Sequence, residues 1–428
     1  MLDRLSNWWS SIPTARLRRV LIVVYLLTAV ADAGGKALAA NPRINAAAQR
    51  LVTGRSADDL RRASRPSGNF EIFRTASRHL FTGDDLYAEY PAAHTDRFKY
   101  SPTFALLFSP LAWLPWPLAL FLWSALNALL LFVAVERVLP QRQALLAMAF
   151  MHLEVLRGMQ NAQSNALVAA LIVLAFAAME RGRHWRTAAA VALGASVKIF
   201  PLAALTFALP HRRAFRAGLA AIVVGVLLVA LPLLAMTPAA LLAQYQSWRA
   251  VESVDALQRW FSIMALASRW GALGWPNWIM QLAGTAALLV PLALRRDRWD
   301  DPRFRLLYLC SVLLFVVLFN HQAERASYLI AFTGVCIWFA SEPRAAWRTA
   351  LFGIALVTVP LMSTLIPGAW LRTPAATTYR LALPCFVIWL AIQRALLRPA
   401  EPALARRAPR SSDELRVELD LNVALEGG

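Results

Sequence analysis

The chain has 428 residues, 58% of them hydrophobic and 16% charged, and it carries a formal net charge of +19. Apolar runs of roughly 17 to 25 residues, long enough to cross a bilayer as a helix, recur along it and exclude a soluble globular protein. The positive charge does not indicate nucleic-acid binding, because the arginines gather in short turns between apolar runs, where the positive-inside rule places them.

Ten apolar segments are predicted to be full transmembrane helices. The first, residues 17–38, follows three arginines and has no persuasive small-residue cleavage site, so we expect a retained span rather than a cleaved signal peptide. The others are residues 117–136, 144–158, 164–180, 214–235, 276–294, 304–320, 326–340, 348–365 and 379–397. The predicted fold class is therefore an all-α polytopic membrane protein.

Two further apolar stretches are too short or too broken to be ordinary spans. Residues 103–114, bounded by prolines, are predicted to be a half-helix. Residues 187–211 are interrupted by Lys198 and Pro201, which predicts a hairpin or a broken, re-entrant helix. Irregular backbone at membrane depth is tolerated only where it is packed in protein or lines a cavity.

The arginine-rich turns predict the orientation of the chain. The turns at residues 137–142, 181–186, 212–216, 295–305, 344–348 and 394–398 are assigned to the cytoplasmic face of the cell inner (plasma) membrane. The chain then divides into a cytoplasmic N-terminal segment (1–16), a transmembrane domain (17–398) with an external loop (39–102), and a mobile cytoplasmic tail (399–428) with a short helix over 412–425. Both termini are cytoplasmic in this topology.

The external loop contains an amphipathic stretch. Over residues 69–81, Phe70 and Phe73 share one helical face, while Glu71 and Arg74 share the other. We expect this helix to lie on the outer surface of the membrane.

Several polar clusters fall on the external side in this topology. They are His94, Asp96, Lys99 and Tyr100 in the external loop, Glu154 and Arg157 at the end of one span, Gln163 and Asn165 at the start of the next, Lys198 in the hairpin, and His321, Gln322, Glu324 and Arg325 in an outer turn. The topology is assigned from the arginine-rich turns alone, which do not include these residues. Their location on one side is therefore independent evidence for a site. Carboxylates take a proton from a hydroxyl, amides hold sugar hydroxyls, and Lys or Arg balances a phosphate. The set suits transfer of a group from a lipid phosphate to an alcohol.

Plainer interpretations stay open for some of these residues. Glu154 and Arg157, at i and i+3, have the spacing of a structural ion pair, and Lys198 can reach toward lipid headgroups. We expect no metal and no cofactor, because the sequence has no HExxH, CxxC or glycine-rich phosphate-binding motif and its three cysteines lie singly in apolar segments.

Four stretches of the chain resemble glycosyltransferase family 87, the polyprenol-phosphate-mannose-dependent α-(1,2)-mannosyltransferase-like proteins. They are NFEIFRTASRHLFTGDDLYAEYPAAHTDRFKYSPTFALLFSPLAWLP, QNAQSNALVAALIVLAF, ASVKIFPLAAL and FNHQAERASYLIAFTG, which together fall within residues 69–340. The resemblance implies a GT-C-type bundle with external juxtamembrane helices and a sugar donor carried on polyprenyl monophosphate. In metal-independent members, a carboxylate of the first external loop acts as the base.

The chain departs from the family at that base. The family commonly has Asp where this chain has Asn69, and an amide cannot act as a general base. Asp96 and Glu71 are therefore both candidates for the catalytic carboxylate, with Glu324 as the next.

Other family positions match more closely. Gln163 and Asn165 match a Gln-x-Asn step whose usual preceding Gly is Ala162 here, and Lys198 matches a Lys before an aliphatic-aromatic-Pro step. The residues assigned to substrate binding are Lys99, Lys198 and Arg325 for the donor phosphate, with His94, Tyr100, Gln163, Asn165, His321, Gln322 and Glu324 for the sugar or acceptor.

The predicted function is transfer of a sugar, expected to be mannose, from a polyprenyl-phosphate donor to a glycolipid or cell-envelope glycan on the external side. Expected partners are this donor, a lipid or glycan acceptor and membrane lipids, with no nucleic acid. Two other classes stay open. A transporter or flippase for a lipid-linked sugar would use the same cations without chemistry, and a non-catalytic glycan-assembly scaffold would fit Asn69.

Overall fold

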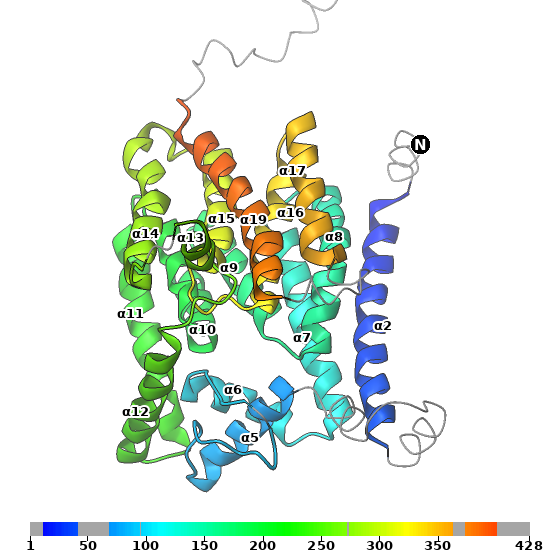
Figure 1. Cartoon of the computed structure of the whole chain (residues 1–428), viewed down its shortest axis with the longest axis vertical. Helices are drawn as coiled ribbons and strands as arrows, with labels where there is room; N and C mark the ends of the chain where they lie inside the picture. The colour runs from blue at the N-terminus through cyan, green and yellow to red at the C-terminus, as the bar shows by residue number, and fades with distance from the viewer. Residues whose placement is uncertain (1–11, 42–67, 95, 272–273, 363–372, 400–428) are drawn as a thin grey trace, which may run out of the picture.

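In the computed structural model, residues 12–41, 68–94, 96–271, 274–362 and 373–399 are described, and every regular element in these ranges is a helix (Figure 1). The helices are α2 (Thr14–Ala40), α5 (Gly68–Thr82), α6 (Pro102–Ala112), α7 (Trp116–Glu136), α8 (Gln141–Gln160), α9 (Asn165–Glu180), α10 (His184–Val197), η1 (Phe200–Ala208), α11 (Ala214–Ala230), η2 (Leu231–Leu234), α12 (Pro238–Asp255), α13 (Ile263–Gly271), α14 (Asn277–Leu294), η3 (Arg296–Arg298), α15 (Pro302–Leu318), η4 (Arg325–Ser327), α16 (Tyr328–Ser341), α17 (Ala346–Leu356), η5 (Val357–Leu361) and α19 (Pro374–Leu397).

Five of these helices are long and apolar enough to cross a membrane. They are α2, α7, α11 with its continuation to Leu234, α14 and α19. Each of the other predicted spans corresponds to a helix that is shorter (α9, α15, α16 and α17) or less apolar (α8) than these five. The all-helical membrane fold is confirmed, whereas the count of ten full spans stays a prediction.

The predicted break around Lys198 separates α10 from η1. The Lys198 backbone is extended (φ −147°, ψ 137°), and the chain turns back as a 3₁₀ helix from Phe200. The returning arm packs closely on α10, since a Cβ added at Gly194 would lie 3.0 Å from Cβ of Pro201. The broken hairpin is therefore packed in protein, as irregular backbone at this depth requires.

The amphipathic helix of the external loop is α5, but the apolar face is not turned to lipid. Phe70 and Phe73 are fully buried, and their rings contact Phe108 of α6 at centroid distances of 5.7 and 5.4 Å. The Ser77 hydroxyl also donates to the Ala105 carbonyl over 2.8 Å. Helices α6 and α7 therefore cover the apolar face of α5, while its location on the outer membrane surface stays a prediction.

Helix α12 was not expected from the sequence. Its composition is too mixed for a span, and the apolar pattern predicts no element over residues 236–275. Gln244 ties it to the external loop by accepting from the Leu86 N–H over 3.0 Å and donating to the Asp84 carbonyl over 3.1 Å. Helices α5, α6 and α12 consequently lie at the same end of the molecule, at the bottom of Figure 1.

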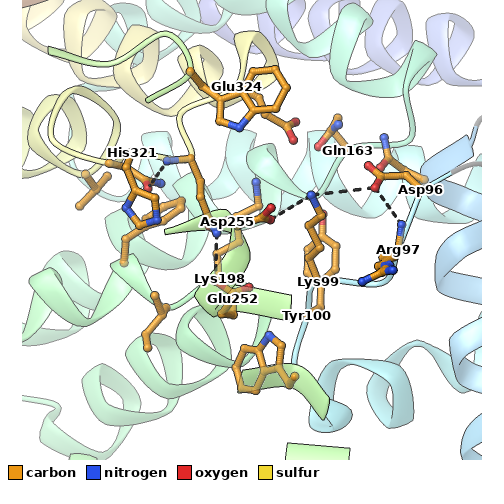
Figure 2. Close-up of a pocket in the computed structure, with 18 of the residues that line it drawn as sticks. Asp96, Arg97, Lys99, Tyr100, Gln163, Lys198, Glu252, Asp255, His321 and Glu324 are labelled. Atoms are coloured by element: carbon orange, nitrogen blue, oxygen red, sulfur yellow. Dashed lines mark hydrogen bonds and ion pairs between the residues drawn. The ribbon is translucent and has the colours of Figure 1, made fainter. Parts of the chain in front are cut away.

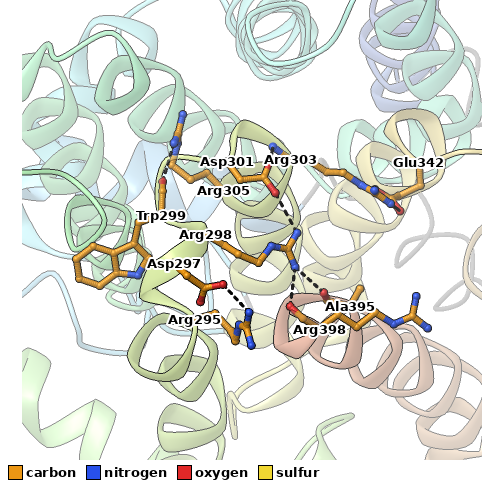
Figure 3. Close-up of polar contacts among 10 residues, drawn as sticks. All are labelled: Arg295, Asp297, Arg298, Trp299, Asp301, Arg303, Arg305, Glu342, Ala395 and Arg398. Atoms are coloured by element: carbon orange, nitrogen blue, oxygen red, sulfur yellow. Dashed lines mark hydrogen bonds and ion pairs between the residues drawn. The ribbon is translucent and has the colours of Figure 1, made fainter. Parts of the chain in front are cut away.

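The arginine-rich turns gather at the opposite end, where the start of α2 and the end of α19 also lie (Figure 1). Ion pairs connect these turns. Glu180, the last residue of α9, lies 2.8 Å from Arg305. Glu342 after α16 lies 2.7 Å from Arg303 (Figure 3). The Arg298 guanidinium donates to the Ala395 carbonyl of α19 over 3.0 Å. The charged turns therefore form one face.

Some predicted segments lie outside the described residues. These are most of the N-terminal segment 1–16, residues 42–67 of the external loop, and the tail beyond residue 399 with its predicted helix over 412–425.

Impermeant maleimide labelling of single cysteines in intact cells tests the sidedness. The charge pattern predicts that cysteines at Ala93 and Leu257 are labelled, whereas those at Arg212 and Ala346 are not, since arginine-rich turns face the cytoplasm. The native cysteines are all buried, which keeps background labelling low. The opposite pattern would invert the topology and place the polar clusters inside the cell.

Candidate functional site

A cavity of about 430 Å³, here called the main cavity, lies where the external loop, α12, the α10–η1 break and the turn after α15 meet (Figure 2). Of the residues predicted to form the site, it is lined by Asp96, Lys99, Tyr100, Gln163, Lys198, His321, Gln322 and Glu324. These residues come from segments more than two hundred positions apart in the sequence, and the fold brings them to one cavity.

Backbone and side-chain hydrogen bonds fix the external loop at the cavity. The Tyr87 hydroxyl donates to the Tyr100 carbonyl over 2.8 Å, and His94 Nδ1 donates to the Asp96 carbonyl over 2.6 Å. Just beyond, the Ser101 hydroxyl donates to the Ser196 carbonyl near the end of α10 over 2.6 Å. The loop is thus anchored on both sides of Asp96 and Lys99.

Lys99 joins the loop to α12. Its Nζ lies 3.0 Å from Oδ2 of Asp255 and 3.9 Å from Oδ1 of Asp96 (Figure 2). Burial alone would lower the pKa of Lys99, but the carboxylates of Asp255, Asp96 and Glu324 outweigh it and raise this pKa above its ordinary value. Lys99 is therefore a stable cation between two carboxylates.

Lys198 reaches the main cavity from the α10–η1 break. Its Nζ donates to Oδ1 of Asn165 over 2.9 Å, and Nδ2 of Asn165 donates to Oε1 of Gln163 over 3.2 Å. The Gln-x-Asn step and the lysine therefore form one hydrogen-bonded chain. Asn165 is buried behind the cavity wall, where it holds Lys198, while Gln163 lines the cavity itself.

The turn before Gln163 has an unusual backbone. Ala162 has φ of +47°, the left-handed region in which a Cβ is strained, and its carbonyl accepts from the Trp123 indole over 3.0 Å. Glycine adopts this conformation freely, which gives a physical reason for the Gly that the family usually has here.

Four predicted site residues do not line the main cavity. Glu71 accepts a hydrogen bond from the Trp116 indole over 2.6 Å, and buried His94 faces the second cavity described below. Asn165 supports Lys198 from behind, and Arg325 is ion-paired with Glu154 over 2.7 Å.

The Glu154 contact changes one interpretation. Arg325, which lies 171 positions away, is ion-paired with this almost fully buried carboxylate, whereas the sequence spacing indicates only Arg157 at i+3. A cation held this way neutralises a buried charge, so it is less available to a substrate phosphate.

Sequence reasoning missed the contribution of α12. Tyr245, Trp248, Arg249, Glu252 and Asp255 all line the main cavity. Their spacing of three or four residues was the available signal, because such positions share one face of a helix. This spacing is hard to recognise in the sequence, because the segment lacks the apolar run that marks the other helices.

Glu252 combines a hydrogen bond with a raised pKa. Gln322 Nε2 donates to its Oε2 over 3.0 Å. Burial raises the pKa of Glu252, as does the neighbouring Asp255 carboxylate, and the Gln322 amide and Lys99 offset only part of the rise. Within the described ranges, no group of three or more His, Cys, Asp or Glu side chains is arranged to hold a metal ion.

A second cavity of about 710 Å³, here called the loop cavity, adjoins the first. The two share Asp96, Arg97, Lys99 and Asp255 as a common wall. The remaining lining of the loop cavity comes from residues 89–94 of the external loop and from Val251 and Val254 of α12.

Fold and cavity together define a polytopic helical membrane protein with a polar site, rich in carboxylates, cations and amides, at one end of its bundle. The sequence model of glycosyltransferase family 87 matches residues 98–320, which is just over half of the chain. The chain belongs to glycosyltransferase family 87. The all-helical bundle agrees with the GT-C architecture expected of the family.

The similar solved structures are distant. The Archaeoglobus fulgidus oligosaccharyltransferase in the apo form shares 13% identity at a TM-score of 0.39, with 93% of this chain and 59% of that chain covered. The archaeal oligosaccharyltransferase AglB from the same organism, in complex with an inhibitory peptide and a dolichol-phosphate, shares 11% identity at a TM-score of 0.31, with 81% and 55% covered. The chain thus spans less than two thirds of either protein. No curated protein matches it.

Ala162→Gly tests the turn that presents Gln163. Relief of the left-handed alanine should stabilise the protein by about 1 kcal/mol, seen as a higher thermal-unfolding midpoint in detergent. Ala170→Gly, in the middle of α9, should instead lose about 1 kcal/mol. An unchanged or lower midpoint for Ala162→Gly would show that this position does not need a left-handed backbone.

Proposed function

We propose that this protein transfers a sugar, in the first instance mannose, from a polyprenyl-phosphate donor to a glycolipid or cell-envelope glycan acceptor on the extracytoplasmic side of the inner (plasma) membrane. The observation that carries the proposal is the grouping of Asp96, Lys99 and Lys198 around one cavity of a family 87 glycosyltransferase. A carboxylate and two cations are the groups that such a transfer needs.

The transfer is a displacement at the anomeric carbon. Asp96 takes the proton of the acceptor hydroxyl while the hydroxyl oxygen bonds to the anomeric carbon, and the bond from that carbon to the phosphate oxygen breaks. The electron pair leaves on polyprenyl phosphate. Lys198, which is held by the neutral Asn165 amide, balances the growing negative charge of this leaving group, which is where a preorganised cation lowers the barrier. Lys99 supports it from its position between Asp255 and Asp96.

Asp96 suits the role of base better than Glu71. It belongs to the external loop and lies on the wall between the two cavities, so it faces both. Its side chain is 65% exposed, which leaves an oxygen accessible to an acceptor, whereas Glu71 is engaged by Trp116 outside both cavities.

The two cavities suggest separate places for the two substrates. Lys198, Ile199 and Phe200 give the main cavity a cation beside apolar side chains, which suits a lipid phosphate. The loop cavity is lined by residues of the external loop, and the same Asp96 forms part of its wall. We therefore place the donor in the main cavity and the acceptor in the loop cavity.

Substitution of the two carboxylates tests the base. Asp96→Asn should lower turnover roughly a hundredfold or more, the scale of a lost general base, while donor binding and expression stay unchanged. Glu71→Gln, the matched change at the other candidate, should cost less. Turnover by purified protein is measured as release of polyprenyl phosphate by mass spectrometry.

The reverse pattern, with Asp96→Asn active and Glu71→Gln inactive, would exchange the assignment. Activity in both variants would exclude both carboxylates and make Glu324 the next candidate.

A further inference from the structure

Helix α12 lines the main cavity with a continuous stripe of side chains. The only one of them with a role in the proposed transfer is Asp255, which supports Lys99. The stripe contains Trp248, Arg249 and Glu252, which all line the cavity. Gln244 and Asp255 of the same helix connect it to the external loop.

Glu252 differs from the paired carboxylates of the protein. Asp255 and Glu154 each lie within ion-pair distance of a Lys or Arg, whereas Glu252 forms no ion pair among the described residues. Its partner is the neutral Gln322 amide, 3.0 Å away. Gln322 is itself positioned, because its backbone N–H donates to Oδ1 of Asn320 over 3.0 Å.

This arrangement leaves acceptor positions of the Glu252 carboxylate free for a neutral ligand. A carboxylate has about four acceptor positions, and the Gln322 amide uses one of them. An unpaired carboxylate repels a phosphate, but it accepts strongly from hydroxyls. The indoles of Trp248 and Trp260 line the same cavity and offer flat apolar faces to the C–H side of a sugar ring.

We infer that Glu252, positioned by Gln322, binds two adjacent hydroxyls of the sugar being transferred and so selects a neutral pyranose with a vicinal diol. This inference rests on the proposed function. The donor then lies in one orientation, with its phosphate toward Lys198 and its sugar toward α12, because the carboxylate favours hydroxyls and disfavours the phosphate. Glu252 is the substrate contact, and Gln322 is a positioning residue.

Two ligands that differ only by the sugar test this inference. Binding of polyprenyl-phosphate-mannose and of polyprenyl phosphate to the purified full chain is measured side by side. Glu252→Gln should weaken binding of the sugar-bearing ligand roughly tenfold to a hundredfold, the range for hydrogen bonds to a charged group, and should leave polyprenyl phosphate unchanged. Lys198→Met should weaken both ligands, because both carry the phosphate.

Two more variants complete the design. Asp84→Asn makes the same carboxylate-to-amide change at an exposed residue outside both cavities and should change neither affinity. Gln322→Leu removes the positioning amide and should show the same sugar-selective loss, so it carries the test if Glu252→Gln does not fold.

The outcomes separate the inference from the function on which it rests. Equal loss of both ligands in Glu252→Gln, or loss of neither, would overturn the sugar subsite while leaving the transferase proposal standing. If the wild-type chain binds neither ligand, the proposed donor is wrong and the subsite falls with it.

Discussion

The contact on which the site depends is the one that Lys99 makes between Asp96 and Asp255. Lys99 of the external loop and Asp255 of α12 are separated by more than 150 positions, and both segments bring carboxylates to the same place. Without a cation between them, these carboxylates would repel one another and drive the loop away from α12. With it, the loop and α12 close the cavity, and Gln244 adds two hydrogen bonds to the same junction.

The carboxylates at the two ends of the molecule differ in their ion pairing. At the arginine-rich end, Glu180 and Glu342 are each satisfied by arginines of neighbouring turns, and the contacts hold the helices in register. At the cavity end, Glu252, Glu324 and Arg249 have no ion-pair partner among the residues that the structure describes. Unpaired charge is expensive near a bilayer, so the two unpaired carboxylates that line this cavity, Glu252 and Glu324, support a site built for a polar ligand.

The sequence predicted the helices well because each span is a local pattern of apolar length, and it predicted the Lys198 break from Pro201. It missed α12, whose mixed composition has no membrane signal and whose role depends on contacts with the distant Leu86 and Gln322. Most of the predicted polar residues do line the cavity, because their positions follow from the ends of the spans. Pairings such as Arg325 with Glu154 are long-range contacts that no local spacing reveals.

The central claim is that this cavity carries out transfer rather than binding or transport alone. The direct measurement incubates the purified full chain with a panel of polyprenyl-phosphate hexoses and cell-envelope glycolipids, and follows donor and products by mass spectrometry. The account predicts release of polyprenyl phosphate and a glycolipid heavier by one hexose, with the mannose donor preferred. Tight binding of the donors with no turnover of any of them would contradict the account and favour a carrier or a scaffold.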